Sequence, residues 1–169
     1  LSKGHDVVGK AQTGTGKTTA FGIPLVESID PSKKLTQGIV LVPTRELAHQ
    51  VSTEIQRLSM FLPIRTMALY GGQSINKQIT DLRNTPHIIV GTPGRILDHI
   101  RRSTIKLNNI RFAILDEADQ MLDIGFADDM IKIIGLTPRS RQTALFSATI
   151  PKTIKRLISR FLRDPSWIQ

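Results

Sequence analysis

Short apolar runs alternate along this chain with longer segments in which apolar residues recur every three or four positions. The short runs are rich in isoleucine and valine and are apolar at successive positions, which is typical of parallel strands covered by helices on both faces. We expect strands at residues 7–11, 38–42, 65–69, 88–90, 112–115 and 143–146, and the start of another at residues 167–169.

Helices are expected in the segments between these runs. The clearest one spans residues 45–61, where apolar side chains spaced by three or four form a single stripe. The stripe consists of Leu47, Val51, Ile55, Leu58 and Leu62. The remaining helices are expected at residues 17–28, 75–82, 94–101, 118–124 with a continuation towards 134, and 152–162.

This alternation predicts an α/β fold, a three-layer domain with a mainly parallel sheet flanked by helices. A length of 169 residues suits one such domain, so we expect residues 1–169 to form a single unit. Ligands of sheets of this kind bind beyond the carboxyl ends of the strands. The loops that lead from a strand into a helix are therefore the candidate sites.

Composition and charge narrow the class of protein. No apolar run is long enough to predict a membrane span, and the start of the chain lacks the pattern of a signal peptide. The absence of cysteine rules out disulfides and thiolate metal sites, and it fits a reducing, cytoplasmic environment. The excess of 23 Lys+Arg over 14 Asp+Glu gives a charge of +9, which favours a polyanionic partner.

The histidines do not have the paired spacing that a zinc site needs. We expect all of them to be ordinary surface or cap residues. They are His5, His49, His87 and His99.

The first expected strand leads into the string AQTGTGKT at residues 11–18, which follows the general phosphate-loop pattern except that Ala11 replaces the first glycine. Glycines let the backbone amides converge on phosphate oxygens, and the helix that follows adds its positive end. Lys17 is expected to reach the β- and γ-phosphates, and the Thr18 hydroxyl to bind Mg²⁺. The alternative is a glycine-rich turn that binds nothing. The candidate nucleotide-binding residues are Ala11, Gln12, Thr13, Gly14, Thr15, Gly16, Lys17, Thr18 and Thr19.

Acidic residues follow the expected strand at residues 112–115. Asp116 is expected to hold the magnesium, and Glu117 to orient or deprotonate the water that attacks the γ-phosphate. The alternative is that these carboxylates only cap the next helix, whose positive end favours negative charge. A phosphate loop in the same chain makes capping alone the poorer explanation.

Residues 116–119 spell DEAD, and with AQTGTGKT they make the chain resemble the DEAD-box RNA helicases. The family's other motifs appear in order: PTRELA at 43–48, a glycine pair at 71–72, TPGR at 92–95 and SAT at 147–149. The resemblance covers essentially the whole chain. It implies a RecA-like first domain of a two-domain, ATP-driven motor that acts on RNA.

The resemblance also implies roles for individual residues. Asp119 would link the nucleotide site to the SAT segment, where Ser147 and Thr149 are implicated in coupling ATP hydrolysis to strand separation. The family's RNA-contacting surface would consist of Pro43, Thr44, Arg45, Gly71, Gly72, Thr92, Pro93, Gly94 and Arg95.

Physical arguments support an RNA-contacting surface at these residues. Thr44 and Thr92 each stand where a strand meets a helix, so they can be N-caps beside exposed amides that bind phosphate. Arg45 and Arg95 can add charge-assisted hydrogen bonds. Such contacts go to phosphate and sugar, so we expect binding that is independent of sequence. The alternatives are plain caps for the threonines, a plain turn for the pair Gly71-Gly72, and pairing of Arg45 with a nearby carboxylate.

Two parts of the family pattern are expected to lie outside this chain, which reads as an excised domain. One is the upstream glutamine-containing segment that recognises adenine, and the other is the second RecA-like domain with its arginines. We therefore expect the chain to be a monomer that binds nucleotide weakly and is nearly inactive by itself. The alternatives are a non-hydrolysing RNA- or partner-binding module, and a different P-loop machine such as a DNA helicase or a transport ATPase.

Overall fold

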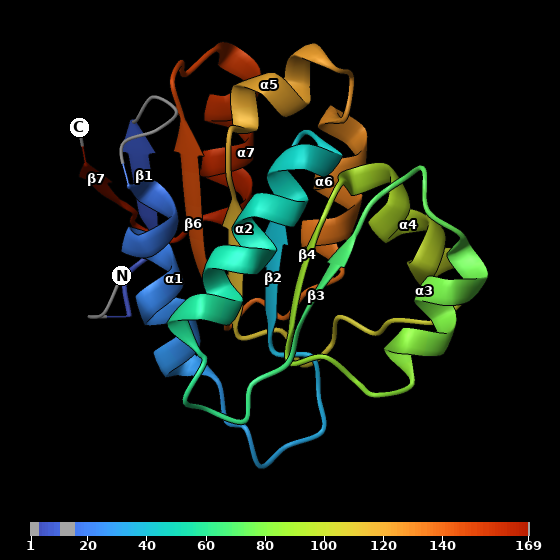
Figure 1. Cartoon of the computed structure of the whole chain (residues 1–169). Helices are drawn as coiled ribbons and strands as arrows, with labels where there is room; N and C mark the ends of the chain where they lie inside the picture. The colour runs from blue at the N-terminus through green and yellow to red at the C-terminus, as the bar shows by residue number, and fades with distance from the viewer. Residues whose placement is uncertain (1–3, 11–15, 169) are drawn as a thin grey trace.

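The computed structural model describes residues 4–10 and 16–168, and within them the strands form one sheet in which every pairing is parallel (Figure 1). The strands are β1 (Val7–Lys10), β2 (Gly38–Leu41), β3 (Thr66–Leu69), β4 (Ile88–Gly91), β5 (Phe112–Leu115), β6 (Gln142–Ser147) and β7 (Ser166–Ile168). Their order across the sheet is β3-β4-β2-β5-β6-β1-β7. All six expected strands are confirmed, and the last one forms near Trp167.

Helices cover both faces of the sheet, as predicted. They are α1 (Lys17–Ser28), α2 (Arg45–Leu58), α3 (Ile75–Leu82), α4 (Pro93–Arg101), α5 (Ala118–Asp123), α6 (Ala127–Gly135) and α7 (Lys152–Phe161). In Figure 1, α1 and α2 lie in front of the sheet, α6 and α7 lie behind it, and α5 lies at the top, beyond the ends of the strands. The three-layer α/β architecture is therefore confirmed.

The central strands are apolar at every position because they contribute to two separate cores. In β2, Ile39 and Leu41 belong to the core shared with α4 to α7, and Val40 belongs to the core shared with α1 and α2. All three side chains are fully buried. Alternate residues of a strand point to opposite faces, so burial of both faces leaves no polar position within the strand.

The expected continuous helix from residue 118 towards 134 is wrong, because the chain forms α5 and α6 with a break between them. Gly125 has a φ of 97°, a left-handed conformation that glycine adopts without strain. The amide of Phe126 donates to the Met121 carbonyl and that of Gly125 to the Leu122 carbonyl. This pair of bonds ends a helix in a Schellman motif, and a glycine past the last turn is its usual sequence signal.

The helix expected at residues 45–61 also ends early, at Leu58. The Ser59 hydroxyl donates to the Ile55 carbonyl at 2.9 Å, and Pro63 follows shortly after, which disfavours a helical conformation at the residue before it. Leu62 is 48% exposed and does not belong to the buried stripe.

Two of the four histidines contradict the expectation of surface positions. His87 and His99 are fully buried, while His5 and His49 are exposed. The Nδ1 of His87 accepts the backbone amide of Arg65 at 3.0 Å. Burial lowers the pKa of both buried imidazoles, since it disfavours the charged form.

Candidate functional site

A lysine and an aspartate from different crossovers meet at the carboxyl edge of the sheet. Lys17 is the first residue of α1, and Asp116 directly follows β5. The Lys17 Nζ lies 3.3 Å from the Asp116 Oδ1, and the side chains are 10% and 3% exposed. Burial raises the pKa of Asp116, although the Lys17 ammonium opposes this change. The expectation that these two side chains lie at one edge is confirmed.

The phosphate loop itself is described only from its last glycine onwards. The predicted nucleotide-binding residues Ala11, Gln12, Thr13, Gly14 and Thr15 lie outside the described residues. Gly16 has a φ of 76° and caps α1, so a left-handed turn delivers Lys17 and Thr18 to the start of the helix. Such a turn followed by a helix start is the geometry that gathers backbone amides around an anion.

Glu117 occupies a strained backbone position beside this ion pair. It has a φ of 51° and a ψ of 50°, the left-handed region that non-glycine residues rarely adopt. Its amide donates to the Asp116 Oδ1 at 3.0 Å. Burial and the neighbouring Asp116 raise the pKa of the Glu117 carboxyl, with Lys17 opposing. Strain of this kind persists only where the surrounding structure imposes it, and it concentrates at functional sites.

A hollow of about 680 Å³ opens over these groups, between the start of α1 and one side of α2. Its volume falls within the usual range for small-molecule sites. The side chains that line it include Lys17, Thr18, Asp116 and Glu117, together with Glu54 of α2. Glu54 accepts a hydrogen bond of 3.4 Å from the Thr19 hydroxyl, a contact between helices that the sequence did not indicate.

Asp119 connects α5 to the segment after β6. Its Oδ2 accepts two hydrogen bonds from Thr149, one from the backbone amide and one from the hydroxyl, both at 2.9 Å. Its own amide donates to the Ser147 hydroxyl at 3.2 Å. Burial alone would raise the pKa of Asp119, but the hydrogen bonds from Thr149 and Ser147 lower it. The DEAD and SAT strings are thus one connected unit in space.

The PTRELA and glycine-pair strings also lie side by side. Thr44 caps α2 by accepting the amide of Leu47 at 3.2 Å, as expected of an N-cap. Gly72 has a φ of 86°, and a Cβ placed on it would lie 3.0 Å from the Arg45 Nη1. The Arg45 Nε donates to the Glu46 Oε1 at 3.0 Å, so the expected alternative of a carboxylate partner is realised. Both side chains of this pair are more than 60% exposed, with values of 64% and 72%. Water and salt screen an ion pair so exposed, so the arginine can exchange it for another anion.

The TPGR string begins α4 with Pro93 at its start, as expected. Thr92 has the extended backbone of an N-cap, but its side chain makes no capping hydrogen bond, which differs from the expectation. Gly94 is exposed, and open space at Gly71 shows that this glycine is not needed for close packing.

Arg95 is fixed from within the protein. Its Nη1 donates to the Gln73 carbonyl at 3.1 Å and to the Gln78 Oε1 at 2.8 Å. The same Gln78 oxygen lies 2.9 Å from the His99 Nε2, and the Gln78 amide donates to the Tyr70 carbonyl at 3.1 Å. Because this oxygen can only accept, His99 carries a hydrogen on Nε2.

Neither Gln78 nor His99 is among the functional residues predicted from the sequence. A signal was available for Gln78, because it lies three residues after Ile75 and four before Leu82, on the inward stripe of α3. A polar residue on an inward stripe must find buried partners. Here the partners are Tyr70 and Gln73, which stand on either side of the glycine pair, and Arg95 and His99 of α4.

Among the described residues, no cluster of three or more histidine, cysteine, aspartate or glutamate side chains could hold a metal ion by itself. No helix in that part of the chain is both long and apolar enough to cross a bilayer.

An all-parallel sheet of this order, with Lys17 and Asp116 meeting at its carboxyl edge, defines a RecA-like domain of the P-loop class. The chain belongs to the DEAD/DEAH box helicase family, which matches residues 1–157. The predicted fold class is confirmed, and so is the assignment of the chain to the ATP-binding domain of the DEAD-box RNA helicases.

Curated relatives show how much of a longer protein this chain resembles. DEAD-box ATP-dependent RNA helicase CshA of Bacillus cereus is 52% identical over 167 residues, which are 99% of this chain and 32% of that protein. CshA of Bacillus subtilis is 53% identical over 164 residues, 97% of this chain and 33% of that protein. The chain spans about a third of the length of these relatives.

Solved structures share the fold closely. A DEAD box protein from the hyperthermophile Methanococcus jannaschii aligns with a TM-score of 0.92 and 44% identity, over 97% of this chain and 45% of that one. A hypothetical ATP-dependent RNA helicase from Sulfolobus tokodaii aligns with a TM-score of 0.90 and 37% identity, over 99% of this chain and 48% of that one.

Proposed function

We propose that this domain binds Mg-ATP at the carboxyl edge of its sheet and, together with a second RecA-like domain, hydrolyses it to remodel short RNA duplexes. The observation that carries the proposal is the contact of 3.3 Å between Lys17 and Asp116, with Glu117 as the next residue. A cation for phosphate, a carboxylate for metal and a second carboxylate for water are what phosphoryl transfer requires.

The residues present fit a magnesium ion. Asp116 offers a nearly buried carboxylate, and Thr18 a hydroxyl on the lining of the same hollow. Oxygen donors of this kind suit Mg²⁺, which keeps most of its waters and takes few protein ligands. When bound, the ion neutralises charge on the phosphate oxygens. Lys17 then exchanges its contact with Asp116 for the β- and γ-phosphates.

Glu117 acts as the group that orients or deprotonates the attacking water. Its carboxyl lies on the lining of the hollow, and its raised pKa brings it closer to the operating pH, which favours a general base. The Gly16 turn and the start of α1 provide the positive end at which phosphate binds. Residues 11–15 complete this loop in the proposal.

Asp119 carries the state of the nucleotide site to the SAT segment. Its three hydrogen bonds with Ser147 and Thr149 join the loop after β5 to the loop after β6. RNA contacts in the proposal come from Pro43, Thr44, Arg45, Gly71, Gly72, Thr92, Pro93, Gly94 and Arg95. The arginines and helix starts among them contact phosphate and sugar, so binding does not depend on base sequence.

Calorimetric titration with Mg-ATP, with and without single-stranded RNA, tests the proposal. The 169-residue chain by itself should bind nucleotide weakly and turn it over slowly, because an arginine from a second domain contributes about 10³ to 10⁵ in rate. Lys17→Ala should abolish the binding. RNA binding with no nucleotide binding would instead identify a non-hydrolysing RNA-binding module, and rapid RNA-stimulated turnover by the chain alone would contradict the need for a second domain.

A further inference from the structure

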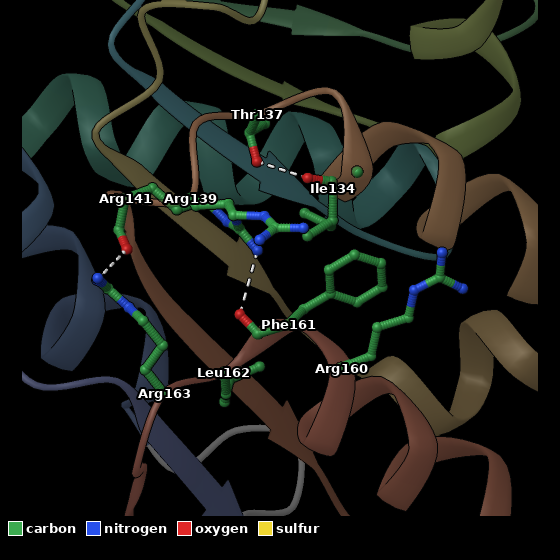
Figure 2. Close-up of a pocket in the computed structure, with 9 residues that line it drawn as sticks. Ile134, Thr137, Arg139, Arg141, Arg160, Phe161, Leu162 and Arg163 are labelled. Atoms are coloured by element: carbon green, nitrogen blue, oxygen red, sulfur yellow. Dashed lines mark hydrogen bonds between the residues drawn. The ribbon is translucent and has the colours of Figure 1, made fainter.

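Four arginines gather at the end of the molecule opposite the nucleotide edge, the carboxyl edge of the sheet at which we propose that Mg-ATP binds. They surround a hollow of about 480 Å³ between the end of α6, the loop that precedes β6 and the end of α7 (Figure 2). The arginines are Arg139, Arg141, Arg160 and Arg163. The strand β6 starts beside this hollow and ends at Ser147. Its 6 residues span roughly 20 Å, at about 3.3 Å per residue.

The lining of the hollow is strongly positive. It includes no aspartate or glutamate, and its remaining residues are apolar or neutral. In the described part of the chain, neither Arg139 nor Arg160 has a hydrogen-bonded or ion-paired partner for its guanidinium. Grouped like charges repel one another, so an arrangement of this kind favours an anion as its occupant.

Arg141 lines the hollow, and hydrogen bonds within the protein hold it in place. It is only 5% exposed, its Nη1 donates to the Pro138 carbonyl at 3.0 Å, and its Nη2 to the Phe161 carbonyl at 3.2 Å. Its Nε is buried without a hydrogen-bond partner. Burial lowers the pKa of Arg141, while Asp6 behind it opposes the change. Asp6 already accepts the backbone amides of Thr143 and Arg163.

Contacts within the protein also hold the guanidinium groups of Arg160 and Arg163. The Arg160 guanidinium carbon lies 5.1 Å from the centre of the Phe161 ring, and that of Arg141 lies 5.9 Å from it. Cations at these distances are attracted to the ring. The Arg163 Nη2 donates to the Arg141 carbonyl at 2.9 Å and to the Ser140 carbonyl at 3.4 Å. Figure 2 shows Arg139 and Arg141 on one side of the Phe161 ring, the Arg160 guanidinium on the other side, and Arg163 beside the Arg141 carbonyl.

We propose that this hollow is a binding site for a phosphate group, separate from the nucleotide edge. Arginine forks match the oxygens of phosphate and form short, charge-assisted hydrogen bonds with them. Arg139 and Arg160 supply the free donors, and Arg141 supplies fixed positive charge behind them. The Phe161 ring already contacts two guanidinium groups, so recognition rests on the phosphate and not on stacking of a base. The phosphate can belong to a small phosphorylated molecule or to an RNA backbone.

The test uses the 169-residue chain with Lys17→Ala and Asp116→Asn, which removes phosphate binding at the nucleotide edge. Inorganic pyrophosphate is titrated while the NMR signals of the arginine Nε–H groups are recorded. Saturable shifts of the signals from the four lining arginines are expected. Arg139→Ala with Arg160→Ala should weaken binding about tenfold or more, since each removes a hydrogen bond to a charged group.

Arg83→Ala with Arg101→Ala is the matched control, because both residues are exposed, neither lines the hollow, and the net charge falls equally. Absence of saturable shifts, or equal weakening in the control, would overturn the proposal. A titration with oligouridylate that lacks a terminal phosphate identifies the source. Shifts of the same signals indicate an RNA backbone, whereas a response to pyrophosphate alone indicates a small phosphorylated molecule.

Discussion

At the carboxyl end of β6, the Ser147 hydroxyl accepts the amide of Asp119 near a group of carboxylates. Near its amino end, two arginines from the preceding loop and two from the end of α7 and the residues after it line one hollow. Three charged side chains at the carboxyl edge have partners inside the protein. Lys17 pairs with Asp116, and Asp119 accepts the donors of Thr149. The arginines at the amino edge, the edge at which β6 begins, line a hollow that contains no carboxylate.

The two edges therefore differ in how the protein holds and balances its cations. At the carboxyl edge, Lys17 and Asp116 form an ion pair, so the charge of this lysine is balanced within the protein before any ligand binds. At the opposite edge, carbonyls and an aromatic ring hold the arginines in place, and no carboxylate on the lining of the hollow balances their charge. Substitutions at each edge should therefore have different consequences.

The largest expected effect concerns Glu117, the carboxylate that follows Asp116 at the carboxyl edge. In a protein that carries both RecA-like domains, Glu117→Gln should leave ATP binding intact and lower RNA-stimulated hydrolysis by about 10² to 10⁴, the usual contribution of a general base. Phosphate release and calorimetry measure the two quantities separately. Hydrolysis within tenfold of the unsubstituted protein would show that this carboxylate does not act on the water.

Lys17→Ala should leave Asp116 buried without its cation. Removal of one partner from a buried ion pair costs about 3–5 kcal/mol of stability. The pKa of Asp116 is already raised by burial and should rise further. A raised pKa in the folded state means that the native protein holds its proton longer than the unfolded chain does. The free energy of unfolding should therefore fall as pH increases above the unfolded value for aspartate, near 3.9.

Denaturant unfolding of the Lys17→Ala variant between about pH 4 and pH 7 measures this slope. Lys17→Ala combined with Asp116→Asn is the matched control, because it removes the titrating group, and most of the loss and of the slope should disappear. A slope that persists in the double variant would assign it to another group. The arginine hollow should bind phosphate equally in both variants.

Gln78→Ala should weaken the positioning of Arg95 at the proposed RNA-contacting surface. It removes the acceptor of Arg95 and His99, and buried donors left without partners cost about 1–3 kcal/mol. Unfolding experiments should show this loss, and the salt dependence of RNA affinity should become shallower if Arg95 no longer contacts phosphate. Lys77→Ala, at the exposed neighbouring position, controls for loss of a residue from α3. An unchanged salt dependence would mean that Arg95 needs no support from Gln78.

The smallest expected effect concerns the strained backbone of Glu117. Glu117→Gly should increase the free energy of unfolding by about 0.5–1 kcal/mol, because relief of left-handed strain exceeds the entropy cost of glycine. The same substitution should suppress hydrolysis in the two-domain protein. Ser103 has a φ of 55° away from the site, so Ser103→Gly should stabilise similarly and leave hydrolysis unchanged. If neither variant is stabilised, the left-handed conformation stores no strain at these positions.

Much of the fold and of the nucleotide edge was predictable from local patterns. Continuous apolar runs predicted strands such as β2 and β5 because both faces of a central strand are buried. The meeting of Lys17 with Asp116 followed from the rule that parallel strands end at one edge. The two errors in helix boundaries came from capping chemistry, at Gly125 and Ser59, which competes with helical periodicity over only a few residues.

By itself, the sequence determined the order of strands and helices, the fold class and the residues that stand at the strand ends, because periodicity and motifs act over short separations along the chain. Only the tertiary structure decided which distant side chains meet. It placed Arg45 against Gly72, joined Gln78 to Arg95 and His99, and gathered Arg139 with Arg163. The physical reason is that these contacts depend on how helices pack across the sheet, and packing sets distances that no local spacing specifies.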